Sequence, residues 1–477
     1  MLLALASLAI CLLLWVNGLL ASLDRPSVAN ALERRQKELA ALAAPAVPES
    51  LRPQLLGGDP EVELLELLNT QLNEPPIPQL DAQVKPQLEP PGSGSATMQL
   101  ERALLERRHG QQQQARLQLQ QLSSSPVPLP AGQQELLQAL LAQPSSGPKD
   151  GSGSAAPTAA ERQRLLLATP DPLLRRLACE GLGGPPPSCR QAASEQRALL
   201  QLLAVNLLPL LALLIGVGLL LRQLWLRWRG QAPALAPLVG PRLSLLDLTL
   251  LVAGGFVVLG EVLTPLLVAA PLERLLLGLG LEPIVRQGGL VLGLYLALMS
   301  APVLILMAML ANQGLAPEGG WLQFRWRPLA LNLRRAVASL LMVLPLVSLV
   351  GWAGEQIWGD PGGSNPLLEL VLNSRNPWAL GCFAFTALVL APLFEETIFR
   401  GVLLPVVSRS FGPLSGVLLS SAVFGIAHLS LGELPPLFVL GLGLGWLRLQ
   451  SGRLGASVLM HGLWNGLTFL NLLLLGA

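Results

Sequence analysis

Charged side chains are scarce in this sequence of 477 residues. They make up 13% of the chain, whereas the average for soluble globular domains is roughly 25%. Hydrophobic residues account for 51%, and several charge-free runs are long enough to cross the hydrocarbon core of a bilayer. This balance excludes a soluble cytosolic protein and predicts an integral membrane protein.

Blocks of basic residues are also absent from the sequence. The 32 Lys and Arg residues are nearly matched by 30 Asp and Glu residues, so the net charge is only +2. Proteins that bind nucleic acid usually carry a concentrated run of basic residues. We therefore expect no nucleic acid partner, and we expect membrane lipid to surround much of the chain.

Cysteine is rare, with four residues and no CxxC pair, which argues against a structural zinc site. Cys11 and Cys382 lie in apolar runs, where a thiol packs as a small hydrophobic group. Cys179 and Cys189 lie ten residues apart in a polar, proline-rich stretch that can close a short loop. Whether these two cysteines pair depends on the side of the membrane that they occupy.

The N-terminal part of the chain divides into an apolar start and a polar remainder. Residues 1–22 contain no charged side chain and lack the basic start of a signal peptide, so we predict an uncleaved membrane anchor. Residues 23–195 predict a helical region without recognisable chemistry, in which Thr158 and Glu161 have the spacing of a capping box. Its predicted helices cover residues 27–44, 97–122, 133–143 and 158–182. The linkers, predicted to pack no core because they are rich in Pro, Gly and Ser, are residues 72–96 and 144–157.

The rest of the chain, residues 196–376 and 377–477, predicts an all-α fold in the form of a polytopic transmembrane helix bundle. Proline and glycine interrupt several of the apolar runs, which bilayer helices tolerate when neighbours satisfy the freed backbone groups. About eight core spans are predicted after the anchor, near residues 198–221, 243–270, 288–311, 336–353, 377–394, 412–430, 435–449 and 455–476.

The distribution of arginine between the loops predicts the orientation, because Arg and Lys concentrate in cytoplasmic loops. Loops 222–242 and 312–335 are rich in arginine, whereas acidic residues balance or outnumber the arginines of loops 271–287 and 354–376. This alternation predicts that residues 23–195 are extracytoplasmic, across the bacterial plasma membrane or an equivalent membrane. A disulfide between Cys179 and Cys189 can persist in such a compartment.

The last 101 residues hold only seven charged side chains, so ionisable groups at membrane depth stand out there. Glu395 and Glu396 are interpreted as the end of a span, and Arg400 follows Glu396 by one helical turn. Two of the three histidines of the chain, His428 and His461, are each embedded in an apolar helix.

A charged side chain at the centre of the bilayer costs roughly 2.5–3.5 kcal/mol on insertion scales, so these groups are expected to face one another inside the bundle. The helical period places Glu396 near Arg400 and rotates Glu395 by about 100° away from that pair. One carboxylate is therefore expected to be structural and the other free. His461 and Asn465 lie one turn apart on one helix face, where both can hydrogen-bond the same oxygen.

Such a set of residues suits hydrolysis in two ways. A carboxylate can deprotonate water while histidine and amide donors stabilise the oxyanion that develops on a carbonyl group. A Glu and two His residues can instead hold a divalent metal such as zinc, which activates a bound water. The residues alone do not choose between these two mechanisms.

The same residues resemble the motifs of a known family, the CPBP intramembrane proteases, which include the type II CAAX prenyl endopeptidases and the bacteriocin-immunity (Abi) proteins. The resemblance covers about residues 377–475 and says nothing about residues 1–195. It implies a CAAX-protease-like (metallo)endopeptidase whose peptide or protein substrates lie in the membrane. The three motifs are Glu395–Arg400 (Glu-Glu-x-x-x-Arg), Phe424–His428 (Phe-x-x-x-His) and His461–Asn465 (His-x-x-x-Asn).

The resemblance also implies a role for each motif residue. Glu395 activates the attacking water together with His428, and the third motif stabilises the oxyanion. A metal, where one is used, is bound by Glu395, His428 and His461; a metal-free glutamate mechanism is the alternative. The implied catalytic residues are Glu395, His428, His461 and Asn465, and the implied supporting pair is Glu396 and Arg400.

Other interpretations compete with this one. A non-catalytic membrane scaffold or immunity factor would keep the polar cluster as a contact between helices and would bind a partner through its outer region. A transporter or ion channel would need polar groups on more spans than the sequence contains. Among single residues, Phe424 is interpreted as a packing residue and His109 as part of a solvated helix face, while Asp247 and Glu261 are assigned no role.

Overall fold

A computed structural model describes the chain except for residues 26, 74–92, 126–128, 144–156, 168, 170, 232, 360–361 and 477. Every helix or strand element in the described residues is a helix, so the predicted all-α fold is confirmed. The chain forms two compact units. We call Met1–Val28 with Leu207–Ala477 the membrane unit, and Ala29–Asn206 the N-terminal unit.

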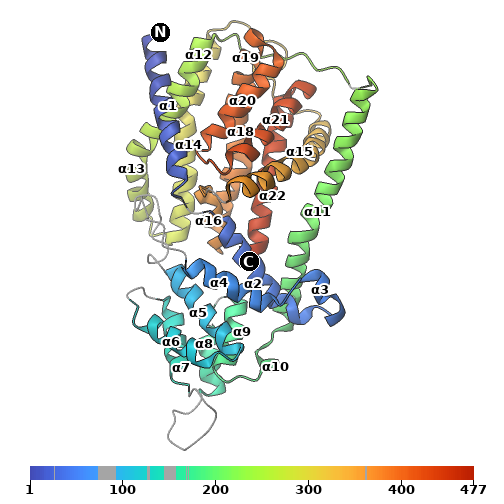
Figure 1. The fold of residues 1–477 in the computed structure, drawn as a ribbon. Helices are drawn as coiled ribbons and strands as arrows, with labels where there is room; N and C mark the ends of the chain where they lie inside the picture. The colour runs from blue at the N-terminus through green and yellow to red at the C-terminus, as the bar shows by residue number, and fades with distance from the viewer. Residues whose placement is uncertain are drawn as a thin grey trace, which may run out of the picture. The chain divides into compact units, whose positions relative to one another are not determined.

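The membrane unit is a bundle of long apolar helices (Figure 1). Among the described residues, seven helices are long and apolar enough to cross a membrane. The protein is therefore a polytopic integral membrane protein, as predicted. Five of the seven are single helices: α1 (Leu2–Ser22), α11 (Ala192–Trp228), α14 (Pro283–Ala311), α15 (Leu329–Trp358) and α22 (Leu454–Gly476).

The sixth long helix, Leu245–Gly278, consists of three consecutive segments. They are α12 (Leu245–Thr249), the π-helix η3 (Leu250–Leu263) and α13 (Thr264–Gly278). Asp247 closes the start of this helix, because its carboxylate accepts from the Ser244 backbone N–H at 2.9 Å while its own N–H donates to the Ser244 hydroxyl at 3.1 Å. This capping box accounts for a charge that the sequence left without a role.

The seventh long helix corrects the sequence prediction, because it runs from Pro377 to Phe411 and does not end near residue 394. Glu395 and Glu396 therefore lie inside a continuous helix and not at its end. The segments alternate between α- and π-helical geometry. They are α17 (Pro377–Phe385), the π-helix η4 (Thr386–Leu390), α18 (Ala391–Glu396), the π-helix η5 (Thr397–Leu403) and α19 (Leu404–Phe411).

Three shorter helices complete the membrane unit: α16 (Pro366–Asn373), α20 (Pro413–Ala427) and α21 (Leu434–Ser451). The predicted spans near 412–430 and 435–449 correspond to α20 and α21, which pack against each other. Small residues at their contact allow the two helices to approach each other closely. A Cβ atom on Gly441 would come within 2.9 Å of the Ser421 side chain, so any larger residue there would push α20 and α21 apart.

Three phenylalanines form a continuous chain of ring contacts in the core of this unit. Phe399 meets Phe256 edge-on at 6.1 Å and Phe424 edge-on at 5.5 Å between ring centroids. All three side chains are buried, and edge-to-face pairs of this kind are favourable beyond their buried area. The predicted packing role of Phe424 is confirmed.

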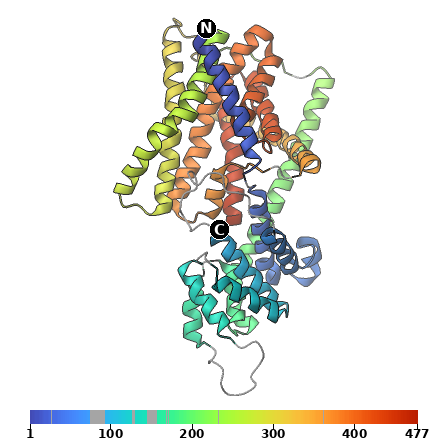
Figure 2. The same cartoon turned by 60° about the vertical axis from the view of Figure 1, so that its left-hand side comes forward.

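The N-terminal helix α1 is part of the bundle. Its buried Cys11 and Trp15 belong to the same core cluster as residues of η3, and α1 lies against η3 in both views (Figure 2). Beyond the helix, the Ser22 hydroxyl accepts from the Leu431 N–H at 3.1 Å, and the Arg25 guanidinium donates to the Leu429 carbonyl. The end of α1 is therefore tied to the loop between α20 and α21.

The N-terminal unit is built from short helices around a leucine-rich core that includes Leu64, Leu68 and Leu100. The longest of its helices outside the predicted ranges is α4, whose buried Leu64 and Leu68 are one turn apart. The helices are α2 (Ala29–Ala43), η1 (Ala44–Ala46), η2 (Glu49–Leu51), α3 (Arg52–Leu55), α4 (Pro60–Asn73), α5 (Ser93–Arg108), α6 (Gln112–Ser123), α7 (Ala131–Leu141), α8 (Ala159–Leu167), α9 (Pro172–Gly181) and α10 (Pro186–Cys189).

Two predicted helices of this unit are each broken in two. The predicted helix 97–122 is interrupted near Gly110, whose φ of 82° lies in the left-handed region that favours glycine. The predicted helix 158–182 is interrupted before Pro172, where Asp171 caps α9 by accepting from two backbone N–H groups. The Thr158–Glu161 capping box is present. Most of the predicted linkers 72–96 and 144–157 lies outside the described residues.

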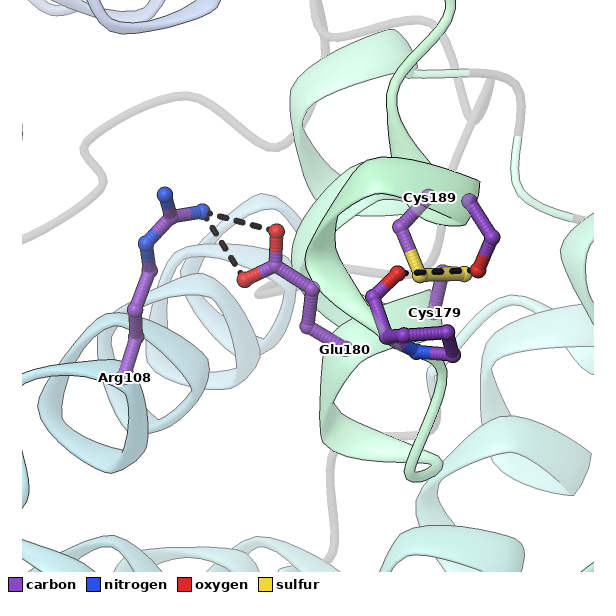
Figure 3. Close-up of a disulfide and its surroundings, with 6 residues drawn as sticks. Arg108, Cys179, Glu180 and Cys189 are labelled. Carbon is purple, nitrogen blue, oxygen red and sulfur yellow. Dashed lines mark hydrogen bonds and ion pairs between the residues drawn. A yellow bond between two sulfur atoms is a disulfide. The ribbon is translucent and has the colours of Figure 1, made fainter.

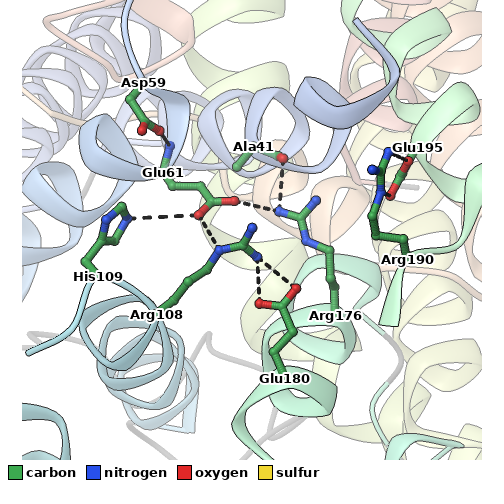
Figure 4. A network of polar contacts seen from close by, with 9 residues as sticks. All are labelled: Ala41, Asp59, Glu61, Arg108, His109, Arg176, Glu180, Arg190 and Glu195. Atoms are coloured by element: carbon green, nitrogen blue, oxygen red, sulfur yellow. Dashed lines mark hydrogen bonds and ion pairs between the residues drawn. The ribbon is translucent and has the colours of Figure 1, made fainter. Parts of the chain in front are cut away.

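Ion pairs and one disulfide connect the helices of the N-terminal unit. Glu61 bridges Arg108 at 3.0 Å and Arg176 at 2.9 Å, and Arg108 also pairs with Glu180 (Figure 4). The exposed ring of His109, predicted to be solvated, approaches Glu61 to 4.0 Å. The pairing that the sequence left open is present, because Cys179 and Cys189 form a disulfide beside the Arg108–Glu180 pair (Figure 3).

Glu101 is a buried carboxyl group in α5 of this unit. Burial, together with repulsion from the carboxylates of Glu38 and Asp171, raises the pKa of Glu101 well above its usual range. The folded chain therefore holds a proton that the unfolded chain has already released. This difference makes folding stability fall as the pH rises above the ordinary pKa of a glutamate.

We predict that Glu101→Gln stabilises the protein at pH 8 and has little effect at pH 4, because the neutral amide removes the cost of burying a charge. Each kcal/mol gained should raise the unfolding midpoint by about 2–4 °C in a domain of this size. Thermal unfolding of the purified full-length protein at both pH values measures this. The matched control is Glu66→Gln, at an exposed position of α4, and equal midpoints for both variants at pH 8 would contradict the prediction.

Candidate active site

A buried ion pair organises the polar cluster of the membrane unit. The Arg400 guanidinium donates from Nη1 to Glu396 Oε1 at 2.8 Å, and neither side chain is exposed to solvent. Nη2 of Arg400 donates to the Gly441 carbonyl at 3.2 Å, and the guanidinium lies 4.4 Å from the centroid of the Phe424 ring. The pair that the sequence predicted is present, and it links the long helix Pro377–Phe411 to α20 and α21.

His461 joins this pair to the second carboxylate. Its Nδ1 lies 3.0 Å from Glu396 Oε1, and its Nε2 lies 3.9 Å from Glu395 Oε2. A carboxylate only accepts, so the hydrogen bond to Glu396 assigns a proton to Nδ1 of the imidazole. The ring of His461 is buried and thus presents Nε2 toward Glu395.

Glu395 has one occupied oxygen and one free oxygen. Oε1 accepts a hydrogen bond from the Tyr295 hydroxyl at 3.1 Å. Oε2 is buried and has no hydrogen-bond partner within the part of the chain that the structure describes. A buried, unpaired carboxylate oxygen is a strong acceptor for the proton of a water molecule. Oε2 of Glu396 is likewise buried without a hydrogen-bond partner among the described residues. The two carboxylates therefore differ in the partners of Oε1, which are Arg400 and His461 for Glu396 and the Tyr295 hydroxyl for Glu395.

His428 contacts the same ring, that of Phe424, as His461 does. Its Nδ1 is 2.8 Å from the Phe424 carbonyl, so Nδ1 carries a proton and Nε2 carries the lone pair. The Phe424 ring meets the His428 ring at 4.8 Å and the His461 ring at 5.6 Å between centroids, edge-on in both cases. The Phe424 ring thus packs against both imidazole rings.

Asn465 contacts the backbone of a neighbouring helix. Its Nδ2 donates to the Ala387 carbonyl at 2.7 Å, within the π-helical segment η4. A π-helical turn leaves carbonyl groups that the regular i→i+4 ladder would have used. The sequence placed Asn465 beside His461 at one shared oxygen, whereas in the structure the two side chains bind different acceptors. The second N–H of the Asn465 amide is not used by this contact.

Tyr295 belongs to this cluster and was missed by the sequence analysis. It lies in α14, far from the three motifs in sequence, and it is the only tyrosine of the chain. A polar hydroxyl in an otherwise charge-free predicted span is the signal that could have identified it. Gly441 was also missed as a partner of Arg400, because only its backbone carbonyl takes part.

The residues proposed as metal ligands do not form a ligand group in this structure. Among the described residues, no group of three or more His, Cys, Asp or Glu side chains is arranged to hold a metal ion. Within the implied set, Nδ1 of His461 already contacts Glu396, and Nδ1 of His428 contacts its own helix. Both contacts use Nδ1 and leave Nε2 of each ring without that partner, an arrangement that metal-bound histidines also have, so the use of a metal stays a prediction.

Comparison with protein families identifies this part of the chain. Residues 377–467 match the family model described as type II CAAX prenyl endopeptidase Rce1-like. These residues form a CPBP-family domain. The CPBP-family domain contains all seven motif residues and begins with α17, but Tyr295 lies outside it.

A second match covers most of the N-terminal unit. Residues 29–200 match a domain of unknown function (DUF8675), which nearly coincides with the compact unit Ala29–Asn206. Neither the curated proteins nor the solved structures give a match to this chain. The functional argument therefore depends on the CPBP-family domain and on the geometry of its polar cluster.

We predict that Glu396→Gln lowers the free energy of unfolding by about 3–5 kcal/mol, because it leaves the buried Arg400 without its charge partner. Thermal or denaturant unfolding of the purified protein measures the loss. Glu395→Gln is the matched control, since it changes the adjacent carboxylate in the same way but leaves the ion pair intact. If both variants were destabilised equally, the ion pair would not be the structural element of the cluster.

Proposed function

We propose that this protein is an intramembrane endopeptidase that hydrolyses peptide bonds of membrane-associated substrates. The observation that carries the proposal is the Glu395 carboxylate, with one buried oxygen free and the imidazole of His461 3.9 Å away. The match to the type II CAAX prenyl endopeptidase family supports it, because the free carboxylate belongs to the first motif of that family. CAAX-type prenylated proteins are one candidate class of substrate.

In the proposed reaction, Glu395 acts as the base. Oε2 takes a proton from a water molecule, and the water oxygen attacks the carbonyl carbon of the scissile bond. The carbonyl oxygen becomes an oxyanion in the tetrahedral intermediate. When the C–N bond breaks, Glu395 returns the proton to the leaving amine. His428, whose Nε2 carries a lone pair, assists in holding the water.

Charge balance favours His461 as a donor to the oxyanion. The cluster contains the carboxylates of Glu395 and Glu396 but only one guanidinium, that of Arg400, so its formal charge is −1 while His461 is neutral. A second proton, on Nε2 of His461, brings the sum to zero in surroundings of low dielectric. That N–H faces Glu395, the side from which the water attacks, and Asn465 contributes its remaining amide N–H from the next turn of α22.

The proposed mechanism is the metal-free alternative, and no step of it passes through a metal ion. The second proposed class is a non-catalytic scaffold or bacteriocin-immunity-type protein. The contact of Asn465 with the Ala387 carbonyl favours that class, since such a contact also holds helices together. Activity of the wild type and loss of activity in one matched variant separate the two classes.

We predict that Glu395→Gln abolishes peptide hydrolysis and changes the unfolding midpoint by less than about 2 °C, because the amide keeps the size of the side chain but cannot act as a base. The loss should be at least about 100-fold in kcat, within the range of general base catalysis. The assay follows cleavage of prenylated and unprenylated peptides by the purified protein in lipid nanodiscs.

Glu273→Gln is the matched control, because Glu273 is an exposed glutamate of α13 in the same membrane unit and has no role in the proposed reaction. Dialysis against EDTA tests the metal-free mechanism in the same assay, and activity should persist. Activity that is lost on dialysis and restored by zinc would overturn that mechanism. A wild type that cleaves no peptide while it remains folded would favour the scaffold.

We also propose that the N-terminal unit lies outside the cytoplasm of the cell, as the arginine distribution of the loops indicates. Its disulfide supports this location, because disulfides persist in oxidising compartments. We predict that alkaline phosphatase fused near residue 150 is active in bacterial cells and that a green fluorescent protein fused there is dark. The reverse pair of signals would show that this orientation is wrong.

A further inference from the structure

Tyr295 reaches the proposed base from outside the CPBP-family domain. Its hydroxyl donates to Oε1 of Glu395 at 3.1 Å, and its ring packs on Phe394, tilted by 42° with centroids 6.3 Å apart. Tyr295 lies in α14 and Glu395 in α18, and the two residues are 100 positions apart in the chain. The hydrogen bond therefore joins the first half of the membrane unit to the reacting carboxylate.

We propose that Tyr295 is a positioning residue for the hydrolysis, one that holds Glu395 in a single orientation and assigns Oε2 as the oxygen that takes the proton from water. This inference rests on the proposed function. The terminal torsion of a glutamate is broad, so an unrestrained carboxylate would present either oxygen. A donor fixed on Oε1 removes that freedom.

The surroundings of Oε2 agree with this assignment. Oε2 has no hydrogen-bond partner within the described residues, although it is buried. Its distance of 3.9 Å from His461 Nε2 is too long for a hydrogen bond, yet one water oxygen can contact both atoms. Water held there lies between the base and the proposed oxyanion donor, whereas Oε1 already accepts from the tyrosine hydroxyl.

The ring and the hydroxyl of Tyr295 can be tested separately. Tyr295→Phe keeps the contact with Phe394 and removes only the hydrogen bond, whereas Tyr295→Leu removes both. We expect Tyr295→Phe to lower kcat by about 10- to 100-fold while KM changes less than about threefold, since the hydroxyl is not proposed to bind substrate. The positioning role would be overturned if Tyr295→Phe kept full activity, or if its KM rose by as large a factor as its kcat fell.

The single tyrosine also gives a readout that does not depend on turnover. Protein labelled with carbon-13 at the tyrosine Cζ gives one resonance, because the chain contains one tyrosine. We expect this resonance to shift in Glu395→Ala, which removes the acceptor, and to stay in place in Glu273→Gln, which changes an exposed glutamate of α13. A resonance that is identical in wild type and Glu395→Ala would overturn the inferred contact.

Together the two measurements separate the inference from the proposed function. Hydrolysis by the wild type that is lost in Glu395→Gln but kept in Tyr295→Phe would leave the protease function intact and reject the inference. An absence of hydrolysis by the folded wild type would reject the function, and the positioning role with it, while the Cζ resonance would still decide whether the contact exists.

Discussion

The ion pair between Glu396 and Arg400 is the constraint on which the rest of the cluster depends. Both groups are fully removed from solvent, and a buried charge without its partner is strongly destabilising. The pair also positions two neighbouring helices, because Arg400 binds the Gly441 carbonyl of α21 and Glu396 binds His461 of α22. Three parts of the bundle are therefore oriented by one carboxylate and one guanidinium, and the imidazole that faces Glu395 is held by that same carboxylate.

Two neighbouring glutamates acquire different chemistry because a helix turns between them. Glu396 faces Arg400 and has no exposed surface, whereas Glu395 faces Tyr295 and His461 and pairs with no guanidinium among the described residues. The neutralised carboxylate can serve as a structural acceptor, and the other remains a base. A single glutamate could not do both, since a proton taken from water would weaken the ion pair that holds the site together.

The sequence predicted this division because it needs only the helical period and the spacing of three residues. It also predicted the all-α bundle and a chain start that packs as a membrane helix, since long apolar runs determine both. It ended the span at residue 394 because charges usually mark the membrane surface; the burial of Arg400 and Glu396 against each other removes that cost and lets the helix continue to Phe411. Tyr295 and Gly441 could not be found from spacing, because their contacts join residues that only the packing of the bundle brings together.

The π-helical segments explain why the helix that carries the glutamates can meet so many partners. η4 and η5 flank α18 on both sides, and a π-helical turn frees carbonyl groups and widens the helix locally. The Ala387 carbonyl of η4 accepts from Asn465, one turn beyond His461 on α22. That contact fixes the rotation of α22 about its axis, and the rotation decides whether Nε2 of His461 faces Glu395 or the core. Asn465 therefore orients His461 through the backbone of α22, while Glu396 orients the same ring through Nδ1, so two independent contacts set the direction of one imidazole.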